Sequence, residues 1–142
     1  MIRLQPIDDA LLHRRRTGRD RVAMALMLLC ALGALYAFAV SVGDVLSAGP
    51  STQQVEIWRT FGFAFFSAVF VLLALWPRWY PGLWEVAIAN KAALTVMEVA
   101  LIANGVANAQ SSAIADGALT VVLIAGYVLA RGWTSWSVRR MP

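Results

Sequence analysis

The chain has 142 residues, of which 60% are hydrophobic and 14% charged, and its formal net charge is +4. A water-soluble domain carries about a quarter charged residues. This composition, with a mean hydropathy of +0.66, therefore excludes an ordinary soluble domain, a disordered chain and a disulfide scaffold, and indicates a small integral membrane protein.

Four apolar stretches are long enough to form a transmembrane helix, which needs about 20 residues. They run from about 22 to 43, 57 to 76, 82 to 104 and 113 to 130. None alternates polar and apolar residues as a membrane β-strand does. Because the connections are short, consecutive helices should be antiparallel neighbours. The sequence predicts an all-α fold, a four-transmembrane-helix antiparallel bundle, with Ser111 or Ser112 as the N-cap of the fourth helix.

Positive charge lies on one side of these four spans. The arginines before the first span, between the second and third, and after the fourth are Arg3, Arg14, Arg15, Arg16, Arg19, Arg21, Arg78, Arg131, Arg139 and Arg140. Because cytoplasmic segments are enriched in basic residues, both termini are predicted to be cytoplasmic. We expect a multi-pass protein of a bacterial-type inner (plasma) membrane, with a basic tail over 1–21, a transmembrane domain over 22–130 and a basic tail over 131–142.

The N-terminal segment has a second interpretation. A basic region, an apolar stretch and the triplet Ala37-Phe38-Ala39 are typical of a cleaved signal peptide. The stretch has the full length of a span, however, which favours a retained helix. The basic cluster at 14–21 sets the topology or also contacts anionic lipid headgroups. A nucleic-acid partner is not expected, because no folded basic domain adjoins the cluster.

The sequence carries few residues for metal or redox chemistry. Cys30 is the only cysteine and His13 the only histidine. An internal disulfide is excluded, and a transition-metal site is not expected. The chain has no Cys-x-x-Cys, no glycine-rich phosphate loop and no nucleophile elbow. We expect neither a metal nor a cofactor.

The third span carries Asn90 and two ionisable residues, Lys91 and Glu98. An ionisable side chain in a bilayer is costly unless it faces protein or water. At about 100° per residue, Lys91 and Glu98 fall within about 20° of each other, and Thr95 and Trp84 lie within about 40° of the same line. We expect this face to point into the bundle.

The other spans add polar residues at their outer ends. Asp44 ends the first span, Glu56 and Arg59 open the second, and Asp116 opens the fourth. These residues are expected to share the outer half of the bundle with Glu98. Arg59 would be the only outer cation near several carboxylates.

The first function that fits this polar cluster is binding of a lipophilic small molecule with one polar end, quinone-like or isoprenoid-like. Such pockets are mostly apolar with a few convergent polar groups. The residues expected to contact the ligand are Arg59, Asn90, Thr95, Phe63, Phe66, Phe70, Trp84 and Asp116. The other expected partner is membrane lipid.

Two further functions stay open. A membrane-embedded isomerase or cyclase would use Glu98 as general acid or base and Lys91 to stabilise negative charge on a lipid-like substrate, with Asp44 as a third catalytic candidate. Alternatively, Lys91 and Glu98 hold the bundle in register or contact another chain, in a homodimer or as an assembly subunit of a larger membrane complex. Polar contacts between membrane helices average about 0.6 kcal/mol, so such a role needs no pocket.

Four short motifs resemble a known family. They are Trp58-Arg59-Thr60-Phe61-Gly62, Trp76-Pro77-Arg78, Pro81-Gly82-Leu83-Trp84 and Asn90-Lys91. Over about residues 22 to 130 the chain resembles the DoxX-like group of small four-helix integral membrane proteins. The resemblance implies a four-helix bundle and assigns no catalytic residue. Founding members of that group are linked to a sulfur-oxidising quinone reductase. A second, weaker similarity is to membrane sterol isomerases.

Overall fold

The computed structural model describes residues 17–138, and all regular structure in this range is helical. The elements are α2 (Gly18–Ser47), α3 (Gln53–Leu75), α4 (Leu83–Ala103), α5 (Ala109–Ala130), the 3-10 helix η1 (Gly132–Thr134) and α6 (Ser135–Val138). The all-α, four-helix prediction is confirmed. Residues 1–16 and 139–142, which carry most of the two predicted basic tails, lie outside the described residues.

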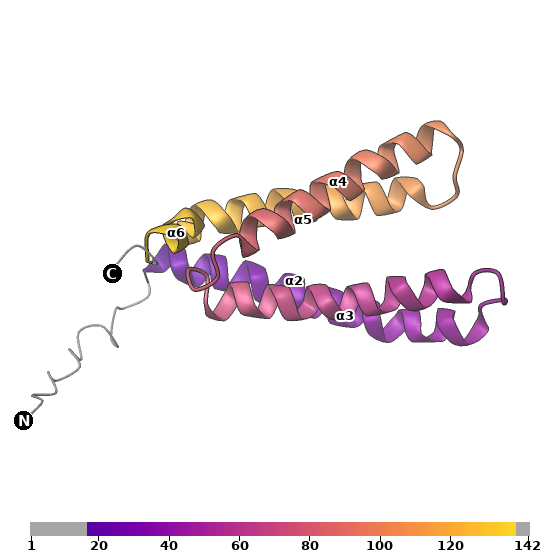
Figure 1. The fold of residues 1–142 in the computed structure, drawn as a ribbon, viewed down its shortest axis with the longest axis horizontal. Coiled ribbons are helices and arrows are strands. Elements are labelled where there is room, and N and C mark those ends of the chain that lie inside the picture. The colour runs from indigo at the N-terminus through magenta and orange to yellow at the C-terminus, as the bar shows by residue number, and fades with distance from the viewer. Residues whose placement is uncertain (1–16, 139–142) are drawn as a thin grey trace, which may run out of the picture.

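The four long helices form two antiparallel hairpins, α2–α3 and α4–α5. The hairpins meet mainly through α2 and α5, and α3 touches α4 at few positions. They lie together at one end and diverge toward the other (Figure 1). We call the first the closed end, formed by the start of α2, residues 76–82 and residues 130–138. The open end is formed by the loops 48–52 and 104–108.

Within residues 17–138, four helices are long and apolar enough to cross a membrane, namely α2, α3, α4 and α5. In their most apolar windows only 11% to 28% of the residues are buried inside the protein. The apolar side chains that remain must therefore be covered by something other than water, and lipid acyl chains supply that cover. The chain is a multi-pass integral membrane protein.

The hydrophobic core cluster to which all four long helices contribute lies in the closed half. Its almost fully buried residues are Ala23, Met27, Phe70, Leu73, Ala74, Trp84, Ala87, Leu123 and Ala130. Small residues allow the close packing around the Trp84 indole: a Cβ added at Gly126 would lie 3.0 Å from this ring and 3.1 Å from Met27 Cε. The core therefore joins the two hairpins only over this half of their length.

Polar contacts fasten the segments that cap the closed end. The indole Nε1 of Trp84 donates to the carbonyl of Pro77 at 2.8 Å, which holds the α3–α4 connection against α4. The Glu85 carboxylate accepts from the Tyr127 hydroxyl at 3.0 Å and from Trp136 Nε1 at 3.1 Å. Glu85 therefore links α4 to both α5 and α6.

The fourth helix begins earlier than the sequence predicted, at Ala109. Asn108 adopts a left-handed conformation with φ of 63°, which turns the chain into the helix at that point. The prediction that Ser111 or Ser112 is the N-cap is wrong, because both lie inside α5, and Ser111 Oγ donates to the Asn108 carbonyl at 2.8 Å. As a result Asp116 lies about two turns inside α5 rather than in its first turn.

The closed-end packing makes Gly132→Ala a direct test of the fold. A Cβ at this position would overlap the Tyr127 ring and lie 2.8 Å from Trp84 Cδ1. We expect a destabilisation of about 1–3 kcal/mol, measured as a lower unfolding midpoint in detergent, because such overpacking forces both rings to move. The control is Gly33→Ala, whose Cβ meets nothing within 4 Å. Equal midpoints for the two variants would contradict the packing described.

Candidate functional site

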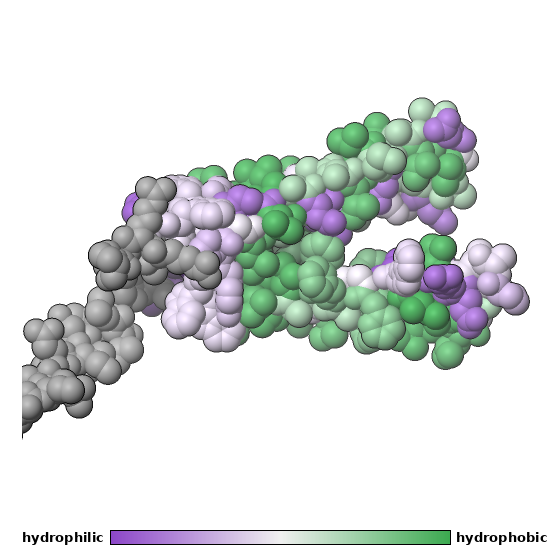
Figure 2. All heavy atoms as spheres, viewed as in Figure 1, coloured by the Kyte–Doolittle hydropathy of each residue, from purple (hydrophilic) through white to green (hydrophobic). Residues whose placement is uncertain are grey.

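The two hairpins separate beyond the core and leave a cleft at the open end. Figure 2 shows this cleft, with hydrophilic residues along the edge of the α4–α5 hairpin that faces it. The opposite wall belongs to the α2–α3 hairpin. The cleft therefore has a partly polar wall on the side of the α4–α5 hairpin.

Lys91 contacts both hairpins and joins three helices. Its Nζ is 2.7 Å from Asp116 Oδ1 on α5, and the two side chains are only 9% and 14% exposed. The same Nζ lies 4.4 Å from the centre of the Phe66 ring on α3. The ammonium is therefore compensated by a carboxylate and by the negative face of an aromatic ring.

Glu98 lies on the same helix as Lys91, seven residues closer to the open end. Its Oε2 is buried and has no hydrogen-bond partner. The carboxyl interacts electrostatically with both Asp116 and Lys91. When all three groups are ionised, two carboxylates face one ammonium. The site therefore has a formal charge of −1 and one buried acceptor that nothing within residues 17–138 satisfies.

Thr95 occupies the turn between Lys91 and Glu98. Its Oγ1 donates to the Lys91 carbonyl at 2.8 Å, so the hydroxyl proton is used within α4. Its methyl group faces α5, where a Cβ added at Gly117 would lie 3.5 Å from Thr95 Cγ2. Thr95 therefore packs α4 against α5 beside the ion pair.

The three phenylalanines of α3 that were predicted to contact a ligand, Phe63, Phe66 and Phe70, occupy different environments. Phe70 is 1% exposed and belongs to the core. Phe66 lies 5.9 Å from Phe70, measured between ring centroids, and carries the Lys91 ammonium on its face. Phe63 is half-buried, one turn nearer the open end. Of these three residues, Phe63 and Phe66 keep part of their rings exposed, whereas Phe70 does not.

A second polar cluster lies at the open end of the other hairpin. Arg59 Nη2 is 2.7 Å from Asp44 Oδ2 and 2.6 Å from Glu56 Oε2. The Arg59 and Asp44 side chains are about half exposed. Arg59 thus pairs with the carboxylates of its own hairpin. The expected single outer cluster is divided in two, because the hairpins diverge exactly where it would have formed.

Two of the residues predicted to contact a ligand lie away from the Lys91–Asp116 pair. Trp84 is 1% exposed within the closed-half core. Asn90 is exposed, although it precedes Lys91, because adjacent residues of a helix point about 100° apart. The structure brings together Lys91, Thr95, Glu98, Asp116 and Phe66. It separates Arg59, Asp44, Asn90 and Trp84 from them.

The Lys91–Asp116 pair was missed at the sequence level. The fourth helix was predicted to start near Ala113, which placed Asp116 at a helix terminus, where the helix dipole stabilises a carboxylate. The signal that could have revealed the pair is the depth of Asp116 in an apolar segment, since a buried acid requires a partner. Lys91 is the nearest basic residue of the preceding span.

The chemistry that the site offers is proton exchange and hydrogen bonding. Glu98 can donate a hydrogen bond when protonated and accept one when ionised. Lys91 supplies a positive charge in a largely dehydrated setting. Within residues 17–138, no group of three or more His, Cys, Asp or Glu side chains is placed to hold a metal ion.

Comparison with protein-family models, with curated proteins and with solved structures gives no match for this chain.

The ion pair predicts a specific pattern of stability. Lys91→Met leaves Asp116 buried without its partner, so we expect it to lower the free energy of unfolding by about 3–5 kcal/mol. Lys91→Met combined with Asp116→Leu should recover most of this loss, because two apolar groups can replace a buried pair at little cost. Unfolding in detergent measures both variants.

The exposed pair at the open end is the control for that series. Arg59→Met removes a cation whose side chain is 47% exposed, and should cost at most about 1 kcal/mol. A double variant as unstable as Lys91→Met alone would show that Asp116 is not the relevant partner.

Proposed function

We propose that the cleft between the two hairpins binds a lipophilic small molecule with one polar group, quinone-like or isoprenoid-like. The observation that carries the proposal is the buried Glu98 Oε2 without a hydrogen-bond partner. A buried polar atom left unpaired costs about 1–3 kcal/mol. A ligand whose polar end hydrogen-bonds to Glu98 removes that cost.

The surroundings of Glu98 support a ligand of mixed character. The Lys91–Asp116 pair adds charged groups that interact with Glu98, and Phe63 and Phe66 provide aromatic surface on the facing hairpin. Binding sites for small molecules combine such apolar walls with a few polar groups that fix orientation. A protonated Glu98 suits a carbonyl oxygen, and an ionised one suits a hydroxyl group.

An acid–base reaction on the same kind of molecule is the second candidate. The observation that favours it is the position of Glu98 beside both a cation and a second carboxylate. In an isomerase or cyclase, Glu98 would transfer the proton and Lys91 would stabilise negative charge on the substrate. The resemblance to the DoxX-like group stays a prediction and assigns neither role.

Mass spectrometry of small molecules that co-purify with the protein tests the binding proposal. We expect the wild type to retain a lipophilic compound and Glu98→Leu to lose about tenfold or more of it, because leucine cannot form the hydrogen bond. Glu98→Gln keeps the size and part of the hydrogen-bonding capacity, so it should retain the compound better than leucine. It would nevertheless abolish any proton transfer.

The matched control is Glu56→Gln, which changes an acid on the other hairpin. It should leave the retained compound unchanged. Glu98→Leu should unfold at or above the wild-type midpoint, because it removes an unsatisfied buried acceptor. If the wild type retains only another membrane chain, the assembly role is favoured over binding. If Glu98→Leu unfolds, the structural role is favoured.

A further inference from the structure

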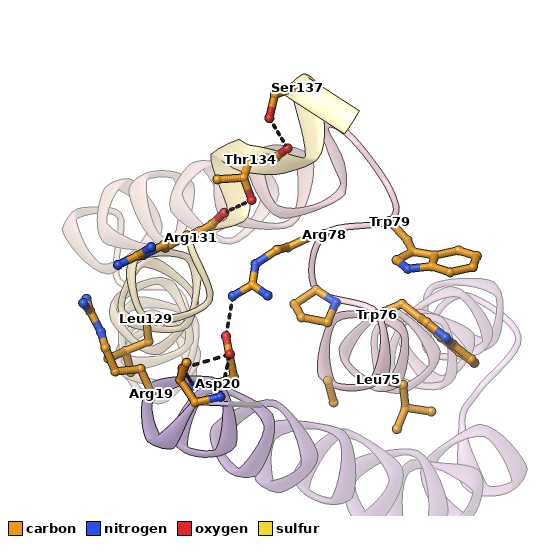
Figure 3. A pocket seen from close by; sticks show the side chains of 13 residues that line it. Arg19, Asp20, Leu75, Trp76, Arg78, Trp79, Leu129, Arg131, Thr134 and Ser137 are labelled. Atoms are coloured by element: carbon orange, nitrogen blue, oxygen red, sulfur yellow. Dashed lines mark hydrogen bonds and ion pairs between the residues drawn. The ribbon is translucent and has the colours of Figure 1, made fainter. Parts of the chain in front are cut away.

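A separate cavity of about 940 Å³ lies at the closed end, far along the helices from the cleft. Its walls come from three segments: the start of α2, the end of α3 with the following connection, and the end of α5 with η1 and α6. Figure 3 shows these segments around the space. The charged side chains in its lining are mainly positive, whereas the site around Lys91, Glu98 and Asp116 has a net negative charge.

Arg78 is the fixed element of this cavity. Its Nε donates to the Ala130 carbonyl at 2.7 Å, and its Nη2 forms an ion pair with Asp20 (Figure 3). Asp20 also accepts from the backbone N–H and the hydroxyl of Thr17 at the N-cap of α2. The one acidic side chain in the lining is therefore already compensated.

Arg19 and Arg131 line the same cavity and form no ion pair with any residue of 17–138. In Figure 3 both side chains extend to the same side of the space, away from Arg78. Among the lining residues within 17–138, three arginines against one aspartate leave a formal charge of +2. On that side the two like charges of Arg19 and Arg131 repel each other, and an anion held between them relieves this repulsion.

The remaining lining is amphiphilic in a way that suits a lipid. Leu75 and Leu129 provide apolar wall on the side of the helices. Trp76 and Trp79 lie at the rim and are 41% and 73% exposed. Exposed tryptophans at helix ends are typical of the membrane–water interface. The arginines therefore lie at the depth of lipid headgroups, with apolar surface next to them.

We propose that this cavity binds the phosphate group of an anionic phospholipid from the leaflet that the closed end faces. Guanidinium groups match phosphate oxygens with paired hydrogen bonds, and Arg19 and Arg131 have their donors available for that contact. The acyl chains of the lipid lie along the apolar wall. The site is independent of the cleft and of the molecule proposed to bind there.

Native mass spectrometry of protein released from vesicles tests this site. The vesicles contain phosphatidylcholine with phosphatidylglycerol, and the readout is the ratio of the two lipids retained. The variant is Arg19→Gln combined with Arg131→Asn. Asparagine is chosen because residue 131 has a left-handed φ of 52°, which asparagine tolerates well. Each arginine should contribute about fivefold, so the double variant should lose about 25-fold of the retained phosphatidylglycerol.

The matched control is Arg21→Gln. Arg21 is exposed on the same turn of α2 and carries the same charge, but it does not line the cavity. It should leave the retained phosphatidylglycerol nearly unchanged. An equal loss in Arg21→Gln and in the double variant, or equal retention of both lipids by the wild type, would overturn the proposal, since either result indicates unspecific attraction to charge.

Calorimetric titration with inorganic phosphate in lipid-free detergent separates the two sources of a phosphate group. One outcome would overturn the proposal of a lipid. In it, the wild type binds inorganic phosphate but retains no phosphatidylglycerol, and the double variant no longer binds phosphate. The site would then belong to a soluble phosphate compound. The double variant should keep the wild-type unfolding midpoint, because neither arginine is paired within the described chain. If the double variant has a lower unfolding midpoint, the single variants Arg19→Gln and Arg131→Asn provide the same test. Each should lose about fivefold of the retained phosphatidylglycerol.

Discussion

The rest of the structure depends on the ammonium of Lys91, which joins three helices where the hairpins begin to separate. A charge at this depth in an apolar bundle is tolerated only where it is compensated. The Asp116 carboxylate and the Phe66 ring supply that compensation from α5 and α3. The pair therefore fixes the rotation of α4 about its own axis. Since Glu98 lies seven residues further on, it shares this face of α4 with Lys91 and interacts electrostatically with Asp116 and Lys91.

The division of the bundle into a packed half and an open half follows from where its small residues lie. Ala23, Ala87, Gly126 and Ala130 allow the four helices to approach around Trp84 in the closed half. Beyond Lys91, Glu98 and Asp116 replace such residues on the inner side of the α4–α5 hairpin. Burying two carboxylates against an apolar partner helix would be unfavourable. The separation of the hairpins avoids this unfavourable burial.

Apolar length and helical periodicity were enough to predict the four spans, their antiparallel order and the shared face of Lys91 and Glu98. The side-chain pairs between helices were harder to predict. Asp116 was misplaced at a helix end because the left-handed Asn108, which starts α5 earlier, leaves no clear trace in the sequence. Arg59 was assigned to a common outer cluster because sequence gives the depth of a residue but not the divergence of two hairpins. In the structure Asp44 and Glu56 already compensate it.

The packed core also interrupts any path through the middle of the bundle. A path from the open end to the closed end would have to pass Met27 and Leu123, which are fully buried, and Trp84, which is 1% exposed. Gly126 packs closely against the Trp84 ring at the same level. A molecule in the cleft of one chain can therefore enter and leave only from the open end or from the surrounding lipid. Such one-sided access is consistent with the proposed ligand, since a lipophilic molecule partitions into the bilayer and can approach the cleft from there.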